Sequence, residues 1–206
     1  MRSKCRQIVR AYAAGFARVK FRTGGDLPPP AILREAIFMR NLEAKFRLPD
    51  LAAAQARAEA IGFTMRAMIQ QRDTFFAVRN GKLKLREESG RASLIHYSRA
   101  REAGLDLSRY EIAEVPNPDA IRAMLAGALG IVAEVRKRRT LLMRRNVRLH
   151  LDRVEGLGDF GEIEAVLAGG DIAAAFRGEV REILAALAVR ADDLIEESYF
   201  EMMPRQ

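Results

Sequence analysis

Charged and apolar side chains alternate along four short segments of the chain, within residues 40–48, 82–88, 146–154 and 159–168. Because successive side chains of a β-strand point to opposite faces, each segment would form a strand with one apolar face and one charged face. The charged faces combine lysines and arginines, which can pair with oxyanions, with carboxylates, which can hold hard divalent cations. Brought together, such side chains could bind an anion with a metal ion.

This alternation is open to two interpretations. The ordinary one is a sheet whose charged face contacts solvent, which is what most alternation of this kind means. The other is an interior lined by charge. Two features favour the interior. The polar faces consist mainly of full charges, and the signs are distributed unevenly, with carboxylates on the first, seventh and eighth predicted strands and cations on the third, fourth and sixth.

Composition limits the class of protein. The chain has 206 residues, 49% of them apolar, which is enough for one domain with a sizeable core. Its net charge of +8 is concentrated in residues 1–38, and the rest is close to neutral. A nonspecific nucleic-acid binder needs a basic face on its folded domain, so we expect no nucleic-acid partner.

The single cysteine, Cys5, excludes an internal disulfide framework, and with only two histidines the chain has little material for a zinc site. A chain without disulfides is typical of a reducing compartment, so we expect the protein in the cytoplasm. No apolar run is long enough for a membrane span, so no membrane partner is expected.

Turn and cap residues divide the chain from Met39 onward into regular segments. Asp50 and Gly62 would bound a first helix, and Asn117 and Gly130 a second. The remaining segments are eight strands at 40–48, 66–79, 82–88, 91–100, 108–115, 131–144, 146–154 and 159–168, and two helices at 171–188 and about 191–203. Strands joined mainly by hairpins suggest a barrel or a wrapped sheet. The fold that we expect is α+β, an eight-stranded antiparallel closed barrel with helices packed outside. We expect one folded domain over 39–206 and a basic, disordered extension over 1–38.

Several motifs resemble, in order along the chain, those of the CYTH or triphosphate tunnel family. They are Asn41-Leu42-Glu43-Ala44-Lys45, Lys82-Leu83-Lys84-Leu85-Arg86-Glu87, Leu94–Arg99, Lys137-Arg138-Arg139, His150-Leu151-Asp152 and Gly156–Glu164. Leu194–Tyr199 is similar to the end of the class IV adenylyl cyclase branch. The similarity runs from about residue 40 to 203. One position departs from the family pattern, because Asn41 stands where the family usually has glutamate.

The resemblance implies a tunnel-shaped barrel whose bore binds a triphosphate with Mg²⁺ or Mn²⁺. It assigns triphosphate binding to seven cations, which are Lys45, Lys84, Arg86, Arg99, Lys137, Arg139 and Arg148. It assigns metal binding to four carboxylates, which are Glu43, Asp152, Glu162 and Glu164, and leaves the catalytic residues unknown. An excess of cations in one bore needs an anionic ligand, and a triphosphate supplies about four negative charges in a form that guanidinium groups can grip.

The resemblance leaves three functions open. The first is the class IV adenylyl cyclase reaction, which converts ATP to cyclic AMP and pyrophosphate. The second is a triphosphatase acting on an inorganic or organic triphosphate, which would use nearly the same charges. The third is a non-catalytic triphosphate or polyphosphate binding protein, which Asn41 favours. The apolar outer faces of a polar-lined barrel need cover from helices or a second subunit, so we also expect a homodimer.

Four further residues carry separate expectations. His150 is predicted to be a hydrogen-bonded structural histidine, and His96 to lie outside the bore. Tyr199 and Phe200 are predicted to pack the C-terminal helix onto the barrel and not to contact a ligand.

Overall fold

The computed structural model describes residues 39–102, 105–166 and 172–204, with side chains described for 43–98, 111–165 and 177–204. The strands are β1 Met39–Arg47, β2 Thr64–Phe76, β3 Lys82–Glu88, β4 Arg91–Glu102, β5 Leu105–Glu114, β6 Ile131–Arg144, β7 Val147–Val154, β8 Gly158–Val166 and β9 Leu194–Ile195. The helices are α2 Leu51–Ala60, α3 Pro118–Leu129, α4 Ile172–Ala186 and α5 Tyr199–Met202, with a 3₁₀ turn at Ala191–Asp193. The extension predicted for residues 1–38 lies outside the described residues, so that domain assignment stays a prediction.

All strands belong to one antiparallel sheet, in the order β5-β4-β3-β2-β6-β7-β8-β1-β9. The sheet curls until β1 also pairs with β5, but only over Met39–Glu43. Because β5 begins at Leu105, it does not reach the second half of β1, where Lys45 and Phe46 pair with β9 instead. The prediction of eight strands in a closed barrel was therefore wrong in detail. Over residues 39–102, 105–166 and 172–204 the sheet has nine strands, and its wall is not closed along its whole length.

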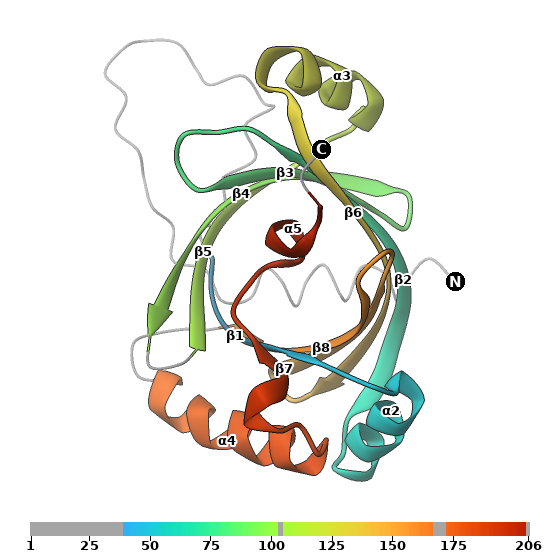
Figure 1. The fold of residues 1–206 in the computed structure, drawn as a ribbon, viewed down its shortest axis with the longest axis vertical. Helices are drawn as coiled ribbons and strands as arrows, with labels where there is room; N and C mark the ends of the chain where they lie inside the picture. Colours follow the sequence, from blue (N-terminus) through green and yellow to red (C-terminus); the bar gives the residue numbers. More distant parts are fainter. Residues whose placement is uncertain (1–38, 103–104, 167–171, 205–206) are drawn as a thin grey trace.

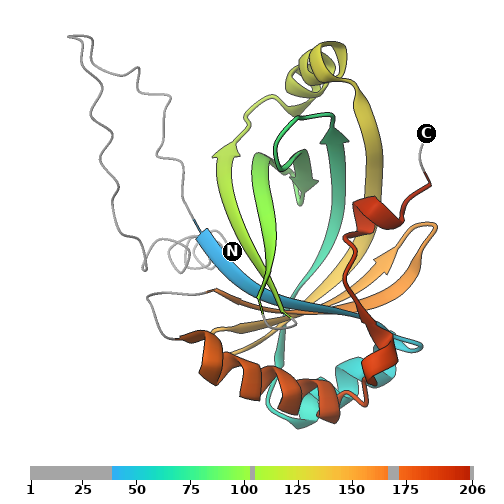
Figure 2. The same ribbon diagram turned by 60° about the vertical axis from the view of Figure 1, so that its left-hand side comes forward.

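Two helices cover the outer face of one side of the sheet, where Figure 2 shows α2 and α4 together beneath β1, β7 and β8. The side chain of Asp50 caps α2 by accepting hydrogen bonds from two backbone amides of its first turn, as its sequence predicted. The outward residues of β1, β7 and β8 are apolar and form a core with these helices, with Phe46, Leu149 and Ile163 fully buried.

A third helix covers the opposite side of the ring (Figure 1). The side chain of Asn117 caps α3, and Pro118 occupies its first turn, again as the sequence predicted. Ile121 and Leu125 of α3 pack against the buried side chains of Phe76 and Leu85, which point outward from β2 and β3. Among the described residues, no helix is long and apolar enough to span a membrane.

The C-terminal segment does not lie outside the barrel as predicted. The sequence predicted one helix over about 191–203, whereas Leu194–Ile195 form β9 and only Tyr199–Met202 form a helix, α5. The segment breaks in this way because β9 fills the open edge of β1 and Ser198 starts a new helix, capped by Glu201. In Figure 1, α5 lies in the centre of the ring of strands. Tyr199 and Phe200 join an inner cluster with Phe75 and Phe160.

Candidate functional site

The inward faces of the strands line one cavity of about 220 Å³. Its lining includes charged residues of β1, β2, β3, β6, β7 and β8, apolar residues of β2, β4, β5 and β6, and the start of α5. Of the side chains that the structure describes, six cations face it, which are Lys45, Lys84, Arg86, Lys137, Arg139 and Arg148. Five carboxylates face it as well, which are Glu43, Asp73, Glu88, Glu162 and Glu164. The charged faces of the predicted strands therefore point inward and not to solvent.

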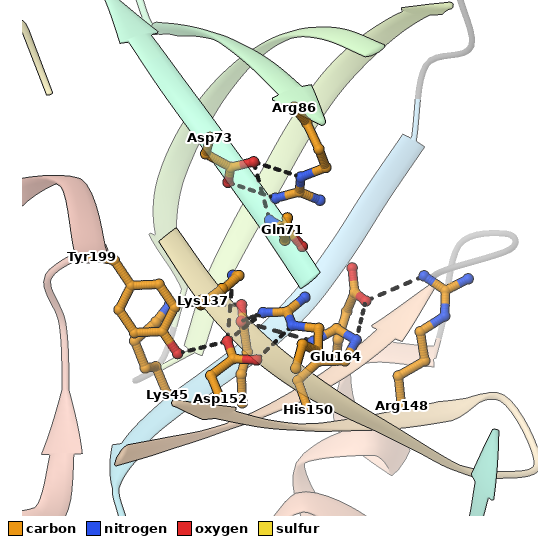
Figure 3. A network of polar contacts seen from close by, with 12 residues as sticks. Lys45, Gln71, Asp73, Arg86, Lys137, Arg148, His150, Asp152, Glu164 and Tyr199 are labelled. Atoms are coloured by element: carbon orange, nitrogen blue, oxygen red, sulfur yellow. Dashed lines mark hydrogen bonds and ion pairs between the residues drawn. The ribbon is translucent and has the colours of Figure 1, made fainter. Parts of the chain in front are cut away.

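Asp73 on β2 organises one wall of the cavity (Figure 3). Its two carboxylate oxygens accept hydrogen bonds from Arg86 Nε and Nη2 at 2.8 and 2.9 Å, and from Lys84 Nζ at 3.0 Å. Gln71 Nε2 donates a further bond to it at 3.0 Å. Burial alone would raise the pKa of Asp73, but the charges of Arg86 and Lys84 hold it well below its usual value. Asp73 is thus an anion that fixes two cations in place.

Asp152 on β7, two strands along the sheet from Asp73, organises a second group of cations in the same way (Figure 3). It is 0% exposed, and its oxygens accept hydrogen bonds from Arg139 Nε and Nη2 at 2.7 and 2.6 Å. Lys137 Nζ lies 3.3 Å from one of these oxygens, and the Tyr199 hydroxyl donates to the same oxygen at 3.0 Å. Burial would raise the pKa of Asp152, but Arg139 and Lys137 hold it below its usual value.

Glu162 and Glu164 on β8 form a third group, beside His150. Arg139 Nη2 donates to Glu162 at 3.0 Å, and Arg148 Nη1 donates to Glu164 at 3.2 Å. His150 lies between the two carboxylates, with its ring nitrogens 3.8 Å from each. Burial and the charge of Arg139 lower the pKa of His150, so its ring is neutral at physiological pH.

Two lysines of the cavity are held at unusual pKa values. Burial, followed by repulsion from Arg86, lowers the pKa of Lys84 to about 7. Burial, followed by repulsion from Arg139, lowers the pKa of Lys137 to about 8. Each of these ammonium groups is therefore poorly compensated where it lies, and an additional anion beside it would favour its charged form.

The structure brings most of the predicted site residues together. Six of the seven predicted cations and three of the four predicted carboxylates line the cavity. Asp152 lies behind the lining, enclosed by its cationic partners. Arg99 is in β4, but its side chain lies outside the described residues, as does that of Asn41. The roles assigned to these residues stay predictions, because geometry alone does not identify a ligand.

Sequence reasoning gave no role in the site to five lining residues, which are Gln71, Asp73, Glu88, Tyr199 and Phe200. The two carboxylates among them change the charge balance. Six cations face five carboxylates in the lining, with Asp152 directly behind it. The predicted excess of cations is therefore not present among the described side chains.

The expectation that Tyr199 only packs outside the barrel was also wrong, because its hydroxyl bonds to Asp152 inside the bore. Its position two residues ahead of Glu201, on a capped turn, gives no sequence signal for this.

The two histidines behave differently from one another. His96 lies outside the cavity, as predicted, and its ring nitrogen Nε2 is 3.0 Å from the carbonyl oxygen of Asn80 in the β2–β3 turn. His150 faces the cavity, and its Nδ1 has no hydrogen-bond partner in the described part of the chain. The prediction that His150 is a hydrogen-bonded structural histidine stays a prediction.

The carboxylates can be tested for their fit to a metal ion. No group of three or more acidic, histidine or cysteine side chains forms a preassembled ligand cage within the described residues. Mg²⁺ needs no such cage, since it is usually bound through one or two carboxylates together with substrate phosphates and water. Glu43 and Glu164 are partners across β1 and β8, and Lys45 and Glu162 are the next pair on the same face. Carboxylates at neighbouring positions on the cavity wall fit this mode of binding.

Comparisons with known proteins agree with this architecture. The family model of the CYTH domain matches residues 39–199. A protein of Methanocaldococcus jannaschii, named "Putative adenylate cyclase MJ0240", is 26% identical over 177 residues, which cover 80% of this chain and 98% of that protein.

Two solved structures share the fold. The PH1012 protein of Pyrococcus horikoshii OT3 has a TM-score of 0.70 at 21% identity, with 80% of this chain and 99% of that chain covered. "Putative adenylyl cyclase HpAC1" of Hippeastrum, for which a dominant triphosphatase activity is described, has a TM-score of 0.58 at 17% identity, with 79% and 94% covered. Because the family model spans most of the chain and contains the strands that line the cavity, the chain belongs to the CYTH domain family.

Proposed function

We propose that this protein binds a triphosphate together with Mg²⁺ or Mn²⁺ in the bore and acts on it. The observation that carries the proposal is the burial of full charges of both signs, contributed by six strands, in one cavity. Charged side chains are costly to bury, and the fold gains no comparable packing from them. A site that must receive a charged ligand explains why they are held there.

The cations of the bore would bind the phosphate oxygens. Arg86 and Arg139 are each held by a carboxylate through two nitrogens, which fixes the plane of the guanidinium group. A guanidinium fixed in this way can present its remaining N–H groups to phosphate oxygens. Lys84 and Lys137 would gain most from the ligand, because their charged forms are the least favoured in its absence.

We assign the metal to Glu43, Glu162 and Glu164, not to Asp152. Both oxygens of Asp152 are occupied by Arg139, and its carboxylate is fully buried behind the cavity wall. Its role is therefore to hold Arg139 and Lys137. When bound, the metal would neutralise charge that develops on the phosphate oxygens during an in-line displacement.

Two reactions are consistent with this site. Formation of cyclic AMP from ATP is favoured by the name of the Methanocaldococcus jannaschii relative, nearly all of whose length this chain covers. Hydrolysis of a triphosphate is favoured by the small volume of the cavity, about 220 Å³. Sites for drug-sized ligands usually have about 300–1,000 Å³. The Hippeastrum protein, which shares the fold, is described with that activity. With α5 in the bore, we therefore propose hydrolysis of a small triphosphate as the main reaction, and cyclisation of ATP as the alternative.

A substrate panel tests both reactions. ATP, GTP, thiamine triphosphate and tripolyphosphate are incubated with Mg²⁺ or Mn²⁺, and cyclic nucleotide, pyrophosphate and phosphate are separated. Glu162→Gln and Lys137→Met should each lower turnover at least tenfold, whereas Arg138→Met, which removes an exposed cation next to Lys137 on β6, should not. Tight binding of tripolyphosphate without metal and without turnover would support a non-catalytic binding protein instead. Failure of all four compounds to bind would contradict the proposal.

We also propose that the protein is a cytoplasmic homodimer. A homodimer is supported by the exposed apolar side chains of Met65 and Met68 on β2. Sedimentation of the full chain at micromolar concentration measures this, and a monomer mass would contradict it.

A further inference from the structure

The cavity consists of a charged part and an apolar part. Phe75, Ile95, Ile112 and Val135 form the apolar part, from β2, β4, β5 and β6. The two parts meet at Lys84, whose Nζ lies 5.6 Å from the ring centre of Phe75. A ligand that filled the whole cavity would therefore place an anionic group next to an apolar one.

The chain itself occupies the apolar part. Phe200 of α5 lines the cavity, and its ring centre lies 4.9 Å from that of Phe75, with an angle of 30° between the planes. This distance is typical of the contacts that two aromatic rings prefer. Lys82 lies over the Phe200 ring, with Nζ 5.4 Å from its centre. A flat ring is thus already packed against the apolar wall.

The hydrogen bonds and ion pairs near this ring are made by its neighbours Ser198, Tyr199 and Glu201, whereas the ring itself is held by packing and by Lys82. Lys82 Nζ pairs with Glu201 at 2.7 Å and with the Ser198 hydroxyl at 3.1 Å. Glu201 also caps α5 by accepting from the Ser198 amide at 2.7 Å. Ion pairs at partly exposed positions such as Lys82–Glu201 add little stability, and α5 has only four residues. Movement of Phe200 therefore needs no rearrangement of the sheet.

We propose that Phe200 is a selectivity residue of the bore, because its ring occupies the place that a flat aromatic substituent of an organic triphosphate would take. This inference rests on the proposed function. Inorganic tripolyphosphate can enter the charged part while Phe200 stays on Phe75. A nucleoside triphosphate must also place its base, and it must first displace the ring. The protein as described therefore binds tripolyphosphate better than ATP.

Calorimetric titration of the full chain tests the inference. Tripolyphosphate and ATP are titrated in EDTA, so that no metal-dependent turnover occurs, into the wild type, Phe200→Ala and Met202→Ala. Met202 lies on the same helix but does not line the cavity, so its variant is the matched control. An aromatic pair is worth about two- to twelvefold in an equilibrium constant. Phe200→Ala should therefore lower the ratio of the ATP Kd to the tripolyphosphate Kd by about that factor, and Met202→Ala should leave it unchanged.

A second variant keeps the ring and weakens only its support. Glu201→Gln removes the charge that pairs with Lys82, and it should shift the ratio in the same direction by a smaller factor. Thermal unfolding of each variant checks that the sheet is intact. If tripolyphosphate binds but the ratio is the same in the wild type and Phe200→Ala, the selectivity role is overturned and the proposed function stands. If neither ligand binds to any variant, in EDTA or in Mg²⁺, both are overturned.

Discussion

The ligand-free protein should become more stable as the pH rises from 7 to 9. Lys84 and Lys137 have folded-state pKa values of about 7 and about 8, below the value of about 10.4 expected in the unfolded chain. Across this range the unfolded chain binds more protons than the folded one, so unfolding becomes less favourable as protons are removed. Below pH 7 both lysines are charged in either state, and the full cost of burying them is present.

The size of the effect follows from these pKa values. Each proton that is bound only by the unfolded chain changes the free energy of unfolding by about 1.4 kcal/mol per pH unit. Lys84, deprotonated in the folded state over most of the range, contributes about 2 kcal/mol between pH 7 and pH 9. Lys137, which titrates in the middle of the range, contributes about 1 kcal/mol. The expected total is about 3 kcal/mol.

Urea unfolding of the full chain at pH 7, 8 and 9 measures this rise. Lys84→Met combined with Lys137→Met should remove it, while Arg138→Met, which removes one exposed cation of β6, should preserve it. Saturating tripolyphosphate should flatten the wild-type profile, because an anion beside the two ammonium groups favours their charged forms. A free energy of unfolding that stays constant or falls between pH 7 and pH 9 in the ligand-free protein would refute the reasoning.

Three other substitutions test the packing around the cavity, each followed by urea unfolding. Asp152→Asn leaves buried cations without their counter-charge and should lower the free energy of unfolding by about 3–5 kcal/mol, part of which bound tripolyphosphate should restore. A decrease below about 1 kcal/mol would show that this carboxylate does not hold the cations. Tyr199→Phe removes one hydrogen bond to Asp152 and should cost about 1 kcal/mol; no loss would mean that the bond adds nothing. Gly161→Ala would place a methyl group on the ring of Phe46 and should lower the free energy of unfolding by about 1–3 kcal/mol. A smaller decrease when the same substitution is made in Phe46→Leu would confirm the overlap, whereas additive decreases would contradict it.

Most of the sheet could be predicted from the sequence because its boundaries are marked by local signals. β3 and β6 have the predicted bounds, and α2 and α3 begin at the predicted cap residues. β9 could not be predicted, because a two-residue strand has no periodicity. It forms only because β5 leaves the second half of β1 without a partner, and that depends on where β5 begins in the folded chain.

The candidate site was predictable wherever charge alternates with apolar residues, and not elsewhere. On β7 the inward Arg148 and Asp152 contrast with the outward apolar Leu149 and Leu151. On β2 this contrast is lost, because the inward Asp73 is flanked by the outward polar residues Arg72 and Thr74. Nothing in that stretch of sequence shows which face is inside. Asp73 was therefore missed although it holds two of the predicted cations.

The charge balance of the bore changes what its ligand must be. A bore with a large excess of cations would favour a bare polyanion, but among the described side chains six cations face five carboxylates, with Asp152 behind them. Asp73 and Asp152 are committed to the arginines and lysines that they hold, whereas Glu43, Glu162 and Glu164 lie together on the β1–β8 wall. A bare triphosphate would lie beside these three carboxylates and be repelled by them, unless a cation lies between. A divalent metal bound with the triphosphate lowers the ligand's net charge and satisfies the carboxylates at the same time. The near balance of charge among the described side chains of the bore is therefore an argument for a metal–triphosphate complex as the ligand. Glu162→Gln, which removes one of the three negative charges, should strengthen binding of tripolyphosphate in EDTA and weaken it in Mg²⁺. Calorimetry that shows a change of the same sign in both buffers would contradict this.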